Sequence, residues 1–326
     1  MTETLTMGRA INQGLRCALE RDPKTLLMGE DIGRLGGVFR VTDGLQKDFG
    51  EQRVIDTPLA ESSILGAAIG LAMRGYRPVV EIQFDGLVYV AFDQIVSQLA
   101  KMHARSAGRV RMPVTVRHPY GGGIGAVEHH SESPEAYFAH TAGLRVVTPS
   151  NPVDAFHLVQ QAIASDDPVV FLEPKRRYWD KAEVDVGSAP GLPMGSARVV
   201  RSGTDVTLVS YGPMVRTCLE AAAAAEGDGT SIEVVDLRSL APLDLKTVID
   251  SVRRTGRCVV AHEASVFLGM SAEVAASVTE ECFYELESPV LRVGGFHTPY
   301  PPSRLEHHYL PDLDRVLDAV DRSLAY

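Results

Sequence analysis

Short apolar runs alternate with helical patterns along most of the chain, and this alternation constrains the fold more than any other feature. It is present between residues 25 and 172 and again between residues 206 and 293. Such alternation is typical of a parallel sheet covered by helices. Because 326 residues exceed the usual size of a single core, we predict two α/β domains, at 1–178 and 197–326. Residues 179–196, which have no periodicity and several Pro and Gly, are predicted to be a linker. The second domain is the smaller one, with a mostly parallel sheet.

The net charge and the spacing of the cysteines exclude several classes of protein. The chain has 32 Lys and Arg against 42 Asp and Glu, a net charge of −10, and no run of basic residues. This balance argues against nucleic acid or an anionic membrane as a partner. No apolar run approaches the ~18 residues that span a membrane. The four cysteines are far apart, and the N-terminus resembles no signal or transit peptide. A reduced, cytoplasmic setting is therefore predicted.

The segment 54–75, VIDTPLAESSILGAAIGLAMRG, contains the first candidate for chemistry. A turn at Asp56-Thr57-Pro58 precedes an apolar helical pattern that ends at Gly75. The glycines and alanines in the middle of this helix predict that another backbone or a ligand comes close. Glu61 begins the helix among apolar and small residues. It is either a carboxylate that favours the helix N-terminus or a functional acid, and the apolar setting favours the second interpretation.

Two glycine-containing stretches suggest phosphate binding but do not complete a site. The loop Gly121–Gly125 does not match the known phosphate-binding patterns and no Lys follows it, so a closely packed active-site loop is the favoured interpretation. Gly227-Asp228-Gly229 would need a downstream Asn to hold Mg²⁺ with a diphosphate, and no Asn follows Asn151. We therefore predict a turn at 227–229 and no complete diphosphate or metal site in this chain.

Histidines gather in the loop that follows, GGGIGAVEHHSESPEAYFAH. The adjacent pair His129 and His130 cannot easily bind one metal ion, and there is no HExxH or nearby cysteine, so a zinc site is not predicted. A histidine beside a glycine-rich loop is suited to acid–base work or to orienting a substrate. A surface histidine before a helix that starts near Ser133-Pro134-Glu135 is the other interpretation, and the residues alone leave both open.

Several long motifs resemble the β subunits of the thiamine-diphosphate-dependent 2-oxo acid dehydrogenases. They include GEDIGRLGGVFRVTDGLQKDFGEQRVIDTPLAE, RPVVEIQFDGLVYVAFDQIVSQLAKMHARSAG, HHSESPEAYFAHTAGLRVVTPSNPVDA, PVVFLEPKRRYW, VVDLRSLAPLD and GGFHTPYPPSRLEHHYLPDLDRVLDAV. The resemblance is collinear from about Leu5 to the end. Within the family the HSxSPEAYFAH loop and the EIQF…AFDQI segment resemble the branched-chain (3-methyl-2-oxobutanoate) type. The β subunits of pyruvate dehydrogenase and of acetoin-cleaving enzymes are the alternatives.

The resemblance implies a transketolase-like fold whose first domain binds the aminopyrimidine of thiamine diphosphate. A separate α subunit would hold the diphosphate and Mg²⁺, in agreement with the incomplete motifs above. Glu61 matches the family's catalytic glutamate, which hydrogen-bonds the pyrimidine ring nitrogen. His130 matches its catalytic loop histidine, which is associated with transfer of the acyl group to the lipoyl arm. Gln83, Phe84 and Leu87 match the residues that line the pyrimidine pocket, although relatives usually carry an aromatic residue at position 87.

The resemblance also implies a structural K⁺ ion bound chiefly by backbone carbonyls. Its ligands would come from Met112, Val114, Thr115, Ala162, Ser165 and Asp167, where Ser165 replaces a commonly acidic ligand.

The implied activity is oxidative decarboxylation of a small 2-oxo acid by a heterotetramer of two α and two β subunits. A lipoyl acyltransferase and a dihydrolipoyl dehydrogenase would complete the complex. A non-catalytic, regulatory subunit with the same fold is the alternative from another class, and the presence of both Glu61 and His130 speaks against it. A self-contained transketolase is disfavoured by the missing Asn.

Overall fold

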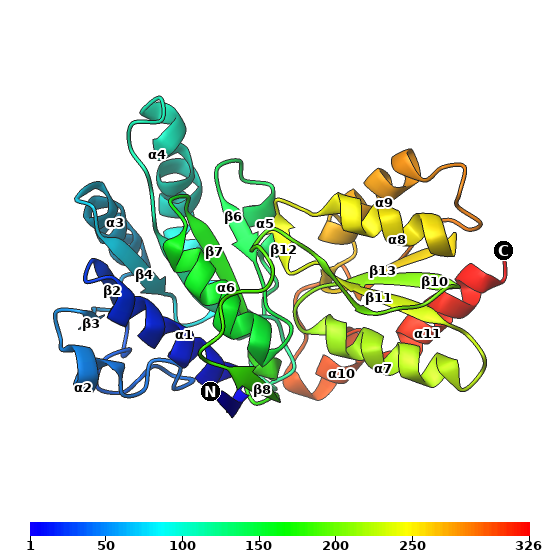
Figure 1. The fold of residues 1–326 in the computed structure, drawn as a ribbon, viewed down its shortest axis with the longest axis horizontal. Helices are drawn as coiled ribbons and strands as arrows, with labels where there is room; N and C mark the ends of the chain where they lie inside the picture. Colours follow the sequence, from blue (N-terminus) through cyan, green and yellow to red (C-terminus); the bar gives the residue numbers. More distant parts are fainter. The chain divides into compact units, whose positions relative to one another are not determined.

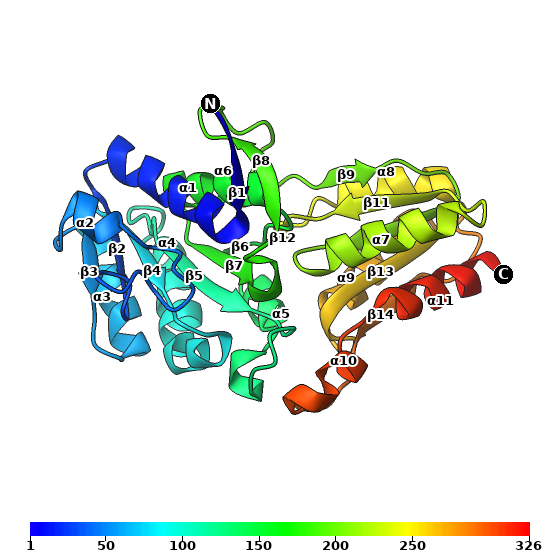
Figure 2. The ribbon, with the colours of Figure 1, turned by 90° about the horizontal axis from the view of Figure 1, so that it is seen from below.

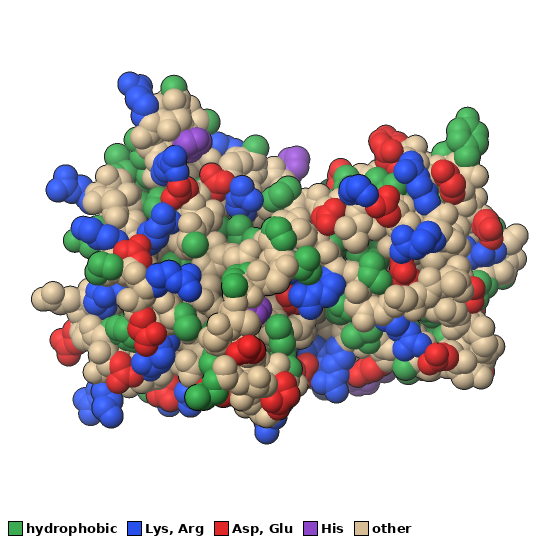
Figure 3. Space-filling view, viewed as in Figure 1, with side chains coloured by type: hydrophobic (Ala, Val, Ile, Leu, Met, Phe, Trp, Pro, Cys, Tyr) green, Lys and Arg blue, Asp and Glu red, His purple; other side chains and the backbone are tan.

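The computed structural model describes residues 1–326, which form two units of alternating strands and helices (Figure 1). Residues 1–120 and 137–194 make up unit 1, and residues 121–136 and 195–326 make up unit 2. None of its helices is long and apolar enough to cross a membrane. On the face shown in Figure 3, acidic and basic side chains are interspersed, with no large patch of one sign.

Unit 1 is built on a sheet whose neighbouring strands are all parallel. In spatial order its strands are β6 (Arg145–Val147), β7 (Val169–Pro174), β5 (Thr115–Tyr120), β4 (Arg77–Glu81), β2 (Thr25–Gly29) and β3 (Val54–Asp56). Strands β2, β5 and β7 are buried along their whole length. Burial on both faces explains why these strands are continuous apolar runs rather than alternating ones.

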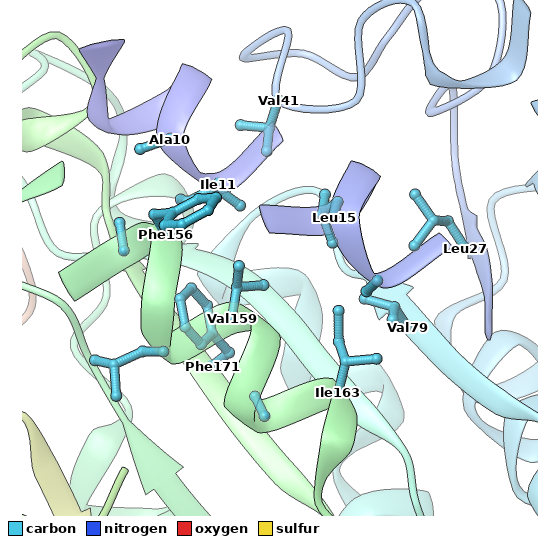
Figure 4. Close-up of a cluster of buried hydrophobic side chains, with 14 of the residues drawn as sticks. Ala10, Ile11, Leu15, Leu27, Val41, Val79, Phe156, Val159, Ile163 and Phe171 are labelled. Carbon is cyan, nitrogen blue, oxygen red and sulfur yellow. The ribbon is translucent and has the colours of Figure 1, made fainter. Parts of the chain in front are cut away.

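Helices cover both faces of the sheet in unit 1 (Figures 1 and 2). On one face α1 (Met7–Arg21) packs along α6 (Pro152–Ala164), and their apolar stripes meet the sheet in the core of Figure 4. Ile11 and Leu15 of α1 point toward Phe156 and Val159 of α6 there. The other face carries α3 (Glu61–Met73), η1 (Asp85–Ala91), the π-helical turn η2 (Gln94–Leu99) and α4 (Ala100–Arg105). Shorter elements are α2 (Leu45–Phe49), α5 (Glu135–Ala139) and η4 (Lys175–Arg177).

Unit 2 has a smaller sheet with the spatial order β14 (Leu291–Gly295), β13 (Cys258–Ser265), β10 (Val206–Ser210), β11 (Ile232–Asp236) and β9 (Arg198–Arg201). All pairs are parallel except that of β9 with β11. Helices α7 (Met214–Glu226) and α11 (Leu313–Leu324) cover one face, and α8 (Leu245–Thr255) and α9 (Met270–Glu281) cover the other (Figure 1). The remaining elements are η3 (Glu128–His130), β12 (Ser239–Ala241), η5 (Ser303–Leu305) and α10 (Glu306–Tyr309).

Two local features of the fold refine the expectations from the sequence. The segment predicted to be a linker contains β8 (Lys181–Asp185), which pairs antiparallel with β1 (Thr2–Thr6) at the start of the chain. Both strands are short and partly polar, so neither shows a clear apolar run. Nothing within the chain packs closely on the glycines of α3, so the predicted close approach is left to a partner chain or a ligand. A Cβ on Gly70 would meet no atom within 4 Å, and one on Gly66 would meet only the Gln94 side chain at 3.7 Å.

Gly143 and Gly70 give a matched pair of glycines for testing this packing. Gly143 has a φ of +103°, and a Cβ there would overlap the carbonyl oxygen of Ala100, whereas Gly70 lies on an exposed helical face with open space beside it. We expect Gly143→Ala to lower the free energy of unfolding by about 2 kcal/mol or more. Gly70→Ala should raise it by up to about 1 kcal/mol. Urea unfolding of the two variants measures both effects, and equal stabilities would contradict the described backbone at residue 143.

Candidate active site

The parallel strands of unit 1 all end at one edge of the sheet, and several residues singled out from the sequence follow those ends. Glu61 comes five residues after β3, and Gln83 and Phe84 come just after β4. The carboxyl edge of a parallel sheet is where ligands bind in open α/β folds. This edge is therefore the candidate active site of unit 1.

Glu61 is the first residue of α3, and only 6% of it is exposed. No hydrogen bond or ion pair within the chain holds its carboxylate. The α3 N-terminus provides a favourable dipole, but that effect is worth only ~0.3–1 kcal/mol. Its carboxylate oxygens, unlike Glu30 Oε2, are not fully enclosed by the protein. Glu61 is therefore suited to meet a polar group that is not part of this chain.

A second carboxyl, that of Glu30, lies near Glu61 and was not recognised from the sequence. Burial raises the pKa of Glu30, and the charges of Asp31 and Glu61 raise it further. Its Oε2 atom is buried and has no hydrogen-bond partner. Burial and nearby negative charges both favour the protonated form of a carboxyl, so Glu30 holds its proton more tightly than an exposed glutamate. The only signal in the sequence was the position of Glu30 directly after the apolar strand β2.

A buried ionic network joins the three neighbouring strands β4, β5 and β7. Arg117 of β5 is 2% exposed. Its Nη1 lies 2.9 Å from Glu81 Oε2 and its Nε 2.6 Å from Glu173 Oε1. The hydroxyl of Tyr178 donates to Glu173 Oε2 at 2.5 Å. Burial raises the pKa of Glu81 although Arg117 acts to lower it. This network was not predicted from the sequence, because its members are far apart in the chain.

The predicted pyrimidine-pocket residues lie beside two buried ion pairs. Glu81 precedes Gln83 and Phe84, and Asp85, which pairs with Lys175 in a fully buried contact, stands between Phe84 and Leu87. The ring of Phe84 packs edge-on against that of Phe39, with centroids 5.6 Å apart. Leu87 is half-buried in η1, where its N–H donates to the Phe84 carbonyl at 3.1 Å. The structure thus brings Gln83, Phe84 and Leu87 together on one short, anchored segment.

His130 belongs to unit 2, in the short helix η3. It is half-buried, whereas His129 is exposed, and the two rings lie 4.3 Å apart between centroids. The His129 Nδ1 atom is 3.5 Å from Glu128 Oε1. Between the two histidines, His130 is the one that packs into the protein.

The residues predicted as K⁺ ligands come from two segments that lie side by side in unit 1. The Met112 N–H donates to the Asp166 carbonyl at 3.2 Å, and the Val169 N–H donates to the Val114 carbonyl at 3.0 Å. Ser165 Oγ donates to the Asp167 carbonyl at 3.0 Å. Several candidate carbonyls thus already accept one hydrogen bond, which leaves one lone pair on each oxygen for an ion.

Glu135, at the start of α5, is a further buried acid that the sequence suggested only as a helix start. Tyr211, which like Glu135 belongs to unit 2, donates a hydrogen bond to its Oε1 atom at 2.8 Å, while Oε2 is buried without a hydrogen-bond partner. Burial raises the pKa of Glu135 to about 7, and the nearby charge of Glu263 contributes. Its proton is therefore held until about neutral pH.

Comparison with known proteins decides the family. Residues 3–180 match the family described as "Transketolase, pyrimidine binding domain", and residues 195–316 match "Transketolase, C-terminal domain". The pyruvate dehydrogenase E1 component subunit beta of Leifsonia xyli subsp. xyli is 62% identical over 324 residues, which cover 99% of this chain and 96% of that protein. The chain belongs to the β subunits of the 2-oxo acid dehydrogenases. The family predicted from the sequence motifs is confirmed.

Other relatives of this β subunit carry names with a different substrate. The 3-methyl-2-oxobutanoate dehydrogenase subunit beta of Mycobacterium tuberculosis is 58% identical over 325 residues, covering 99% of this chain and 93% of the relative. The 2-oxoisovalerate dehydrogenase subunit beta of Pseudomonas aeruginosa is 46% identical over 336 residues, covering 98% and 95%.

A solved structure of a split-gene transketolase, an inactive beta4 tetramer, has a TM-score of 0.82 at 24% identity and covers 98% of both chains. The predicted transketolase-like α/β fold is confirmed.

Glu135 predicts how the stability of this β subunit depends on pH. The pKa of Glu135 in the folded state, about 7, lies above its ordinary value of 4.5. The folded protein therefore holds the proton more tightly, and this stabilisation is full below pH 4.5 and is lost as the pH rises through 7. The loss amounts to about 3 kcal/mol at most. We expect Glu135→Gln, which stays neutral, to remove this decline between pH 5 and 8 in urea unfolding. The exposed Glu280→Gln is the control, and an unchanged pH dependence in Glu135→Gln would refute the assignment.

Proposed function

We propose that this chain is the β subunit of a branched-chain 2-oxo acid dehydrogenase. Together with an α subunit it would bind thiamine diphosphate, decarboxylate a branched 2-oxo acid and pass the acyl group to a lipoyl domain. The single observation that carries the proposal is Glu61, a largely buried glutamate at the carboxyl edge of a parallel sheet whose carboxylate no group of this chain holds. A ring nitrogen of a bound cofactor would satisfy it.

The residues at this edge fit the pyrimidine end of such a cofactor. Thiamine diphosphate, when bound, supplies the carbon that attacks the 2-oxo group and the ring that takes up the electron pair after loss of CO₂. Glu61 would hold a proton at the pyrimidine ring nitrogen, and Glu30 beside it disfavours two negative charges at once. Phe84 and Leu87 would give the ring an apolar wall, and Gln83 a polar contact. Leu87 provides less contact than a stacked aromatic side chain.

The diphosphate end of the cofactor, with Mg²⁺, is assigned to the α subunit. Gly227-Asp228-Gly229 supports this division because it forms the turn that ends α7, with backbone hydrogen bonds from Gly227 and Asp228 to the last helical turn. No group of three or more His, Cys, Asp or Glu side chains could hold a metal ion. The exposed small residues Gly66, Ala67 and Gly70 of α3 leave room for a close-packed partner. An assembly of two α and two β subunits would then join a lipoyl acyltransferase and a dihydrolipoyl dehydrogenase.

His130 is assigned to the second half of the reaction. A half-buried imidazole can donate or accept a proton near neutral pH, as transfer of an acyl group to a dihydrolipoyl thiol requires. The alternative assignment to a surface role fits His129 better, because that side chain is the exposed one of the pair.

The backbone carbonyls around Met112–Thr115 and Ala162–Asp167 are proposed to bind a structural K⁺ ion. Their two segments are already joined by backbone hydrogen bonds, so the ion would reinforce an existing contact.

Substrate choice is tested by turnover of the protein reconstituted with its α subunit. The branched-chain assignment rests on the loop HSESPEAYFAH and the segment EIQF…AFDQI, whereas the 62% identity to a protein named as pyruvate dehydrogenase favours pyruvate. We expect kcat/KM for 3-methyl-2-oxobutanoate to exceed that for pyruvate by about tenfold or more. The reverse ratio would assign the chain to pyruvate, and no turnover of any 2-oxo acid would identify a non-catalytic subunit. Replacing KCl by NaCl in the same assay tests the K⁺ site.

The role of Glu61 is tested by Glu61→Gln in the reconstituted protein. We expect this variant to assemble and to bind thiamine diphosphate but to lose about 10²-fold or more in exchange of the thiazolium proton, because a positioned acid typically contributes that much. The exchange rate is followed by NMR in deuterated water. The matched control is the exposed Glu280→Gln. Normal exchange in Glu61→Gln would reduce Glu61 to a helix-end carboxylate.

A further inference from the structure

The glycine-rich loop Gly121–Gly125 is filled by carboxylates of the same chain. Its glycines at 121, 123 and 125 have positive φ angles of 79°, 88° and 70°, so successive N–H groups can turn toward one side of the loop. Such a concave row of N–H groups binds anions. The Gly122 N–H donates to Glu263 Oε1, and the Gly123 N–H donates to Glu306 Oε1 at 2.9 Å. The loop that resembled a phosphate cradle in the sequence therefore holds two glutamates.

Several further hydrogen bonds hold the Glu306 carboxylate. The Gly125 N–H donates to both of its carboxylate oxygens, at 3.4 Å to Oε1 and 3.1 Å to Oε2. The Tyr300 hydroxyl donates to Oε1 at 2.7 Å. Glu306 begins α10 and lies 183 residues after Gly123. Hydrogen bonds to an ionised carboxylate are among the strongest in proteins, so this contact fixes the loop to the C-terminal segment.

The segment from Tyr300 to Glu306 also lies directly against the loop. A Cβ on Gly122 would overlap the Tyr300 hydroxyl, and one on Gly125 would lie 3.0 Å from Ser303 Oγ. Only glycine lets the two segments approach this closely. The glycines of the loop are therefore explained by contact with residues 300–306 of the same unit.

The anchored glycines and His130 belong to one closed loop. The Gly121 N–H donates to the Glu132 carbonyl at 2.8 Å, which joins the two ends of the loop. Between them, the His130 N–H donates to the Val127 carbonyl at 3.0 Å in the turn of η3. The side chains of Val127 and Glu128 are exposed. The hydrogen bond between Gly121 and Glu132 thus couples the arm that carries His130 to the glycine arm.

We propose that Glu306 is a positioning residue, whose carboxylate fixes the loop Gly121–Gly125 and thereby sets the position of His130 for acyl transfer. The inference rests on the proposed function of His130 and extends it to a residue outside the loop. Glu306 itself touches no reacting atom in this scheme. Its loss should affect the step that uses His130 more than the step that uses Glu61.

The test uses the protein reconstituted with its α subunit and two assays. One follows decarboxylation with an artificial electron acceptor, and the other follows acyl transfer to a lipoyl domain. We expect Glu306→Ala to lower acyl transfer by about tenfold or more while decarboxylation changes by less than about threefold. Glu306→Gln keeps one acceptor oxygen and should lose less, and Tyr300→Phe should act in the same direction. His130→Ala sets the scale, and Glu280→Gln is the control for an exposed glutamate.

Hydrogen exchange of the backbone amides at residues 121–131 gives a readout that does not depend on turnover. The Gly123 and Gly125 amides should exchange faster in Glu306→Ala than in the wild type, and those of α7 should not. Unchanged exchange, equal losses in both assays, or full acyl transfer despite a mobile loop would each overturn the proposal. If Glu306→Ala does not fold, Tyr300→Phe decides by the same criteria. Absence of turnover in the wild type would instead refute the proposed function, and with it the role given to His130, while exchange still reports on the anchor.

Discussion

The candidate site of unit 1 depends most on the two ion pairs of the buried Arg117 guanidinium. Removing a charge from water is costly, and attraction to partners offsets the cost only when the geometry is good. Arg117 meets this condition with Glu81 at 2.9 Å on one side and Glu173 at 2.6 Å on the other. The rigid fork of an arginine suits two carboxylates better than the single ammonium of a lysine. The network therefore holds three neighbouring strands in one arrangement. It is not a large source of stability.

The balance of charge in this region favours a bound proton. Glu81, Glu173 and Asp85 face the cations of Arg117 and Lys175, so acids outnumber bases. His118 adds no positive charge to this region, because burial lowers its pKa to about 4 and keeps it neutral. Burial raises the pKa of Glu81, the most exposed of the three acids. Together with Glu30 beside Glu61, this gives an edge at which protonated carboxyls persist nearer to neutral pH than in water.

The sequence was informative where function and fold are local. Apolar runs and helical periods identified the main strands and helices, because burial on both faces leaves a continuous pattern in each strand. Glu61 and the segment Gln83–Leu87 could be named because each belongs to a single motif. Arg117, Glu173 and Lys175 could not, since their partners are in other strands. A weak signal existed, because charged residues at the ends of apolar runs such as VTVRHPY and VVFLEP are unusual in buried strands. The pairing of β1 with β8 was not predicted either, because short, partly polar strands produce no apolar run.

The glycine-rich loop shows why a pattern of residues can predict a type of interaction and still miss the ligand. Backbone N–H groups turned to one side bind phosphate and carboxylate alike, so glycines alone do not distinguish them. A phosphate loop adds a lysine, and no lysine follows this loop. Its N–H groups instead meet Glu263 and Glu306, both of which come much later in the chain. With its own carboxylates in place, the loop has no N–H groups at 122, 123 and 125 left for a diphosphate. The occupied loop and the incomplete motif at 227–229 thus lead to the same proposal, that the phosphate end of the cofactor is bound by another chain.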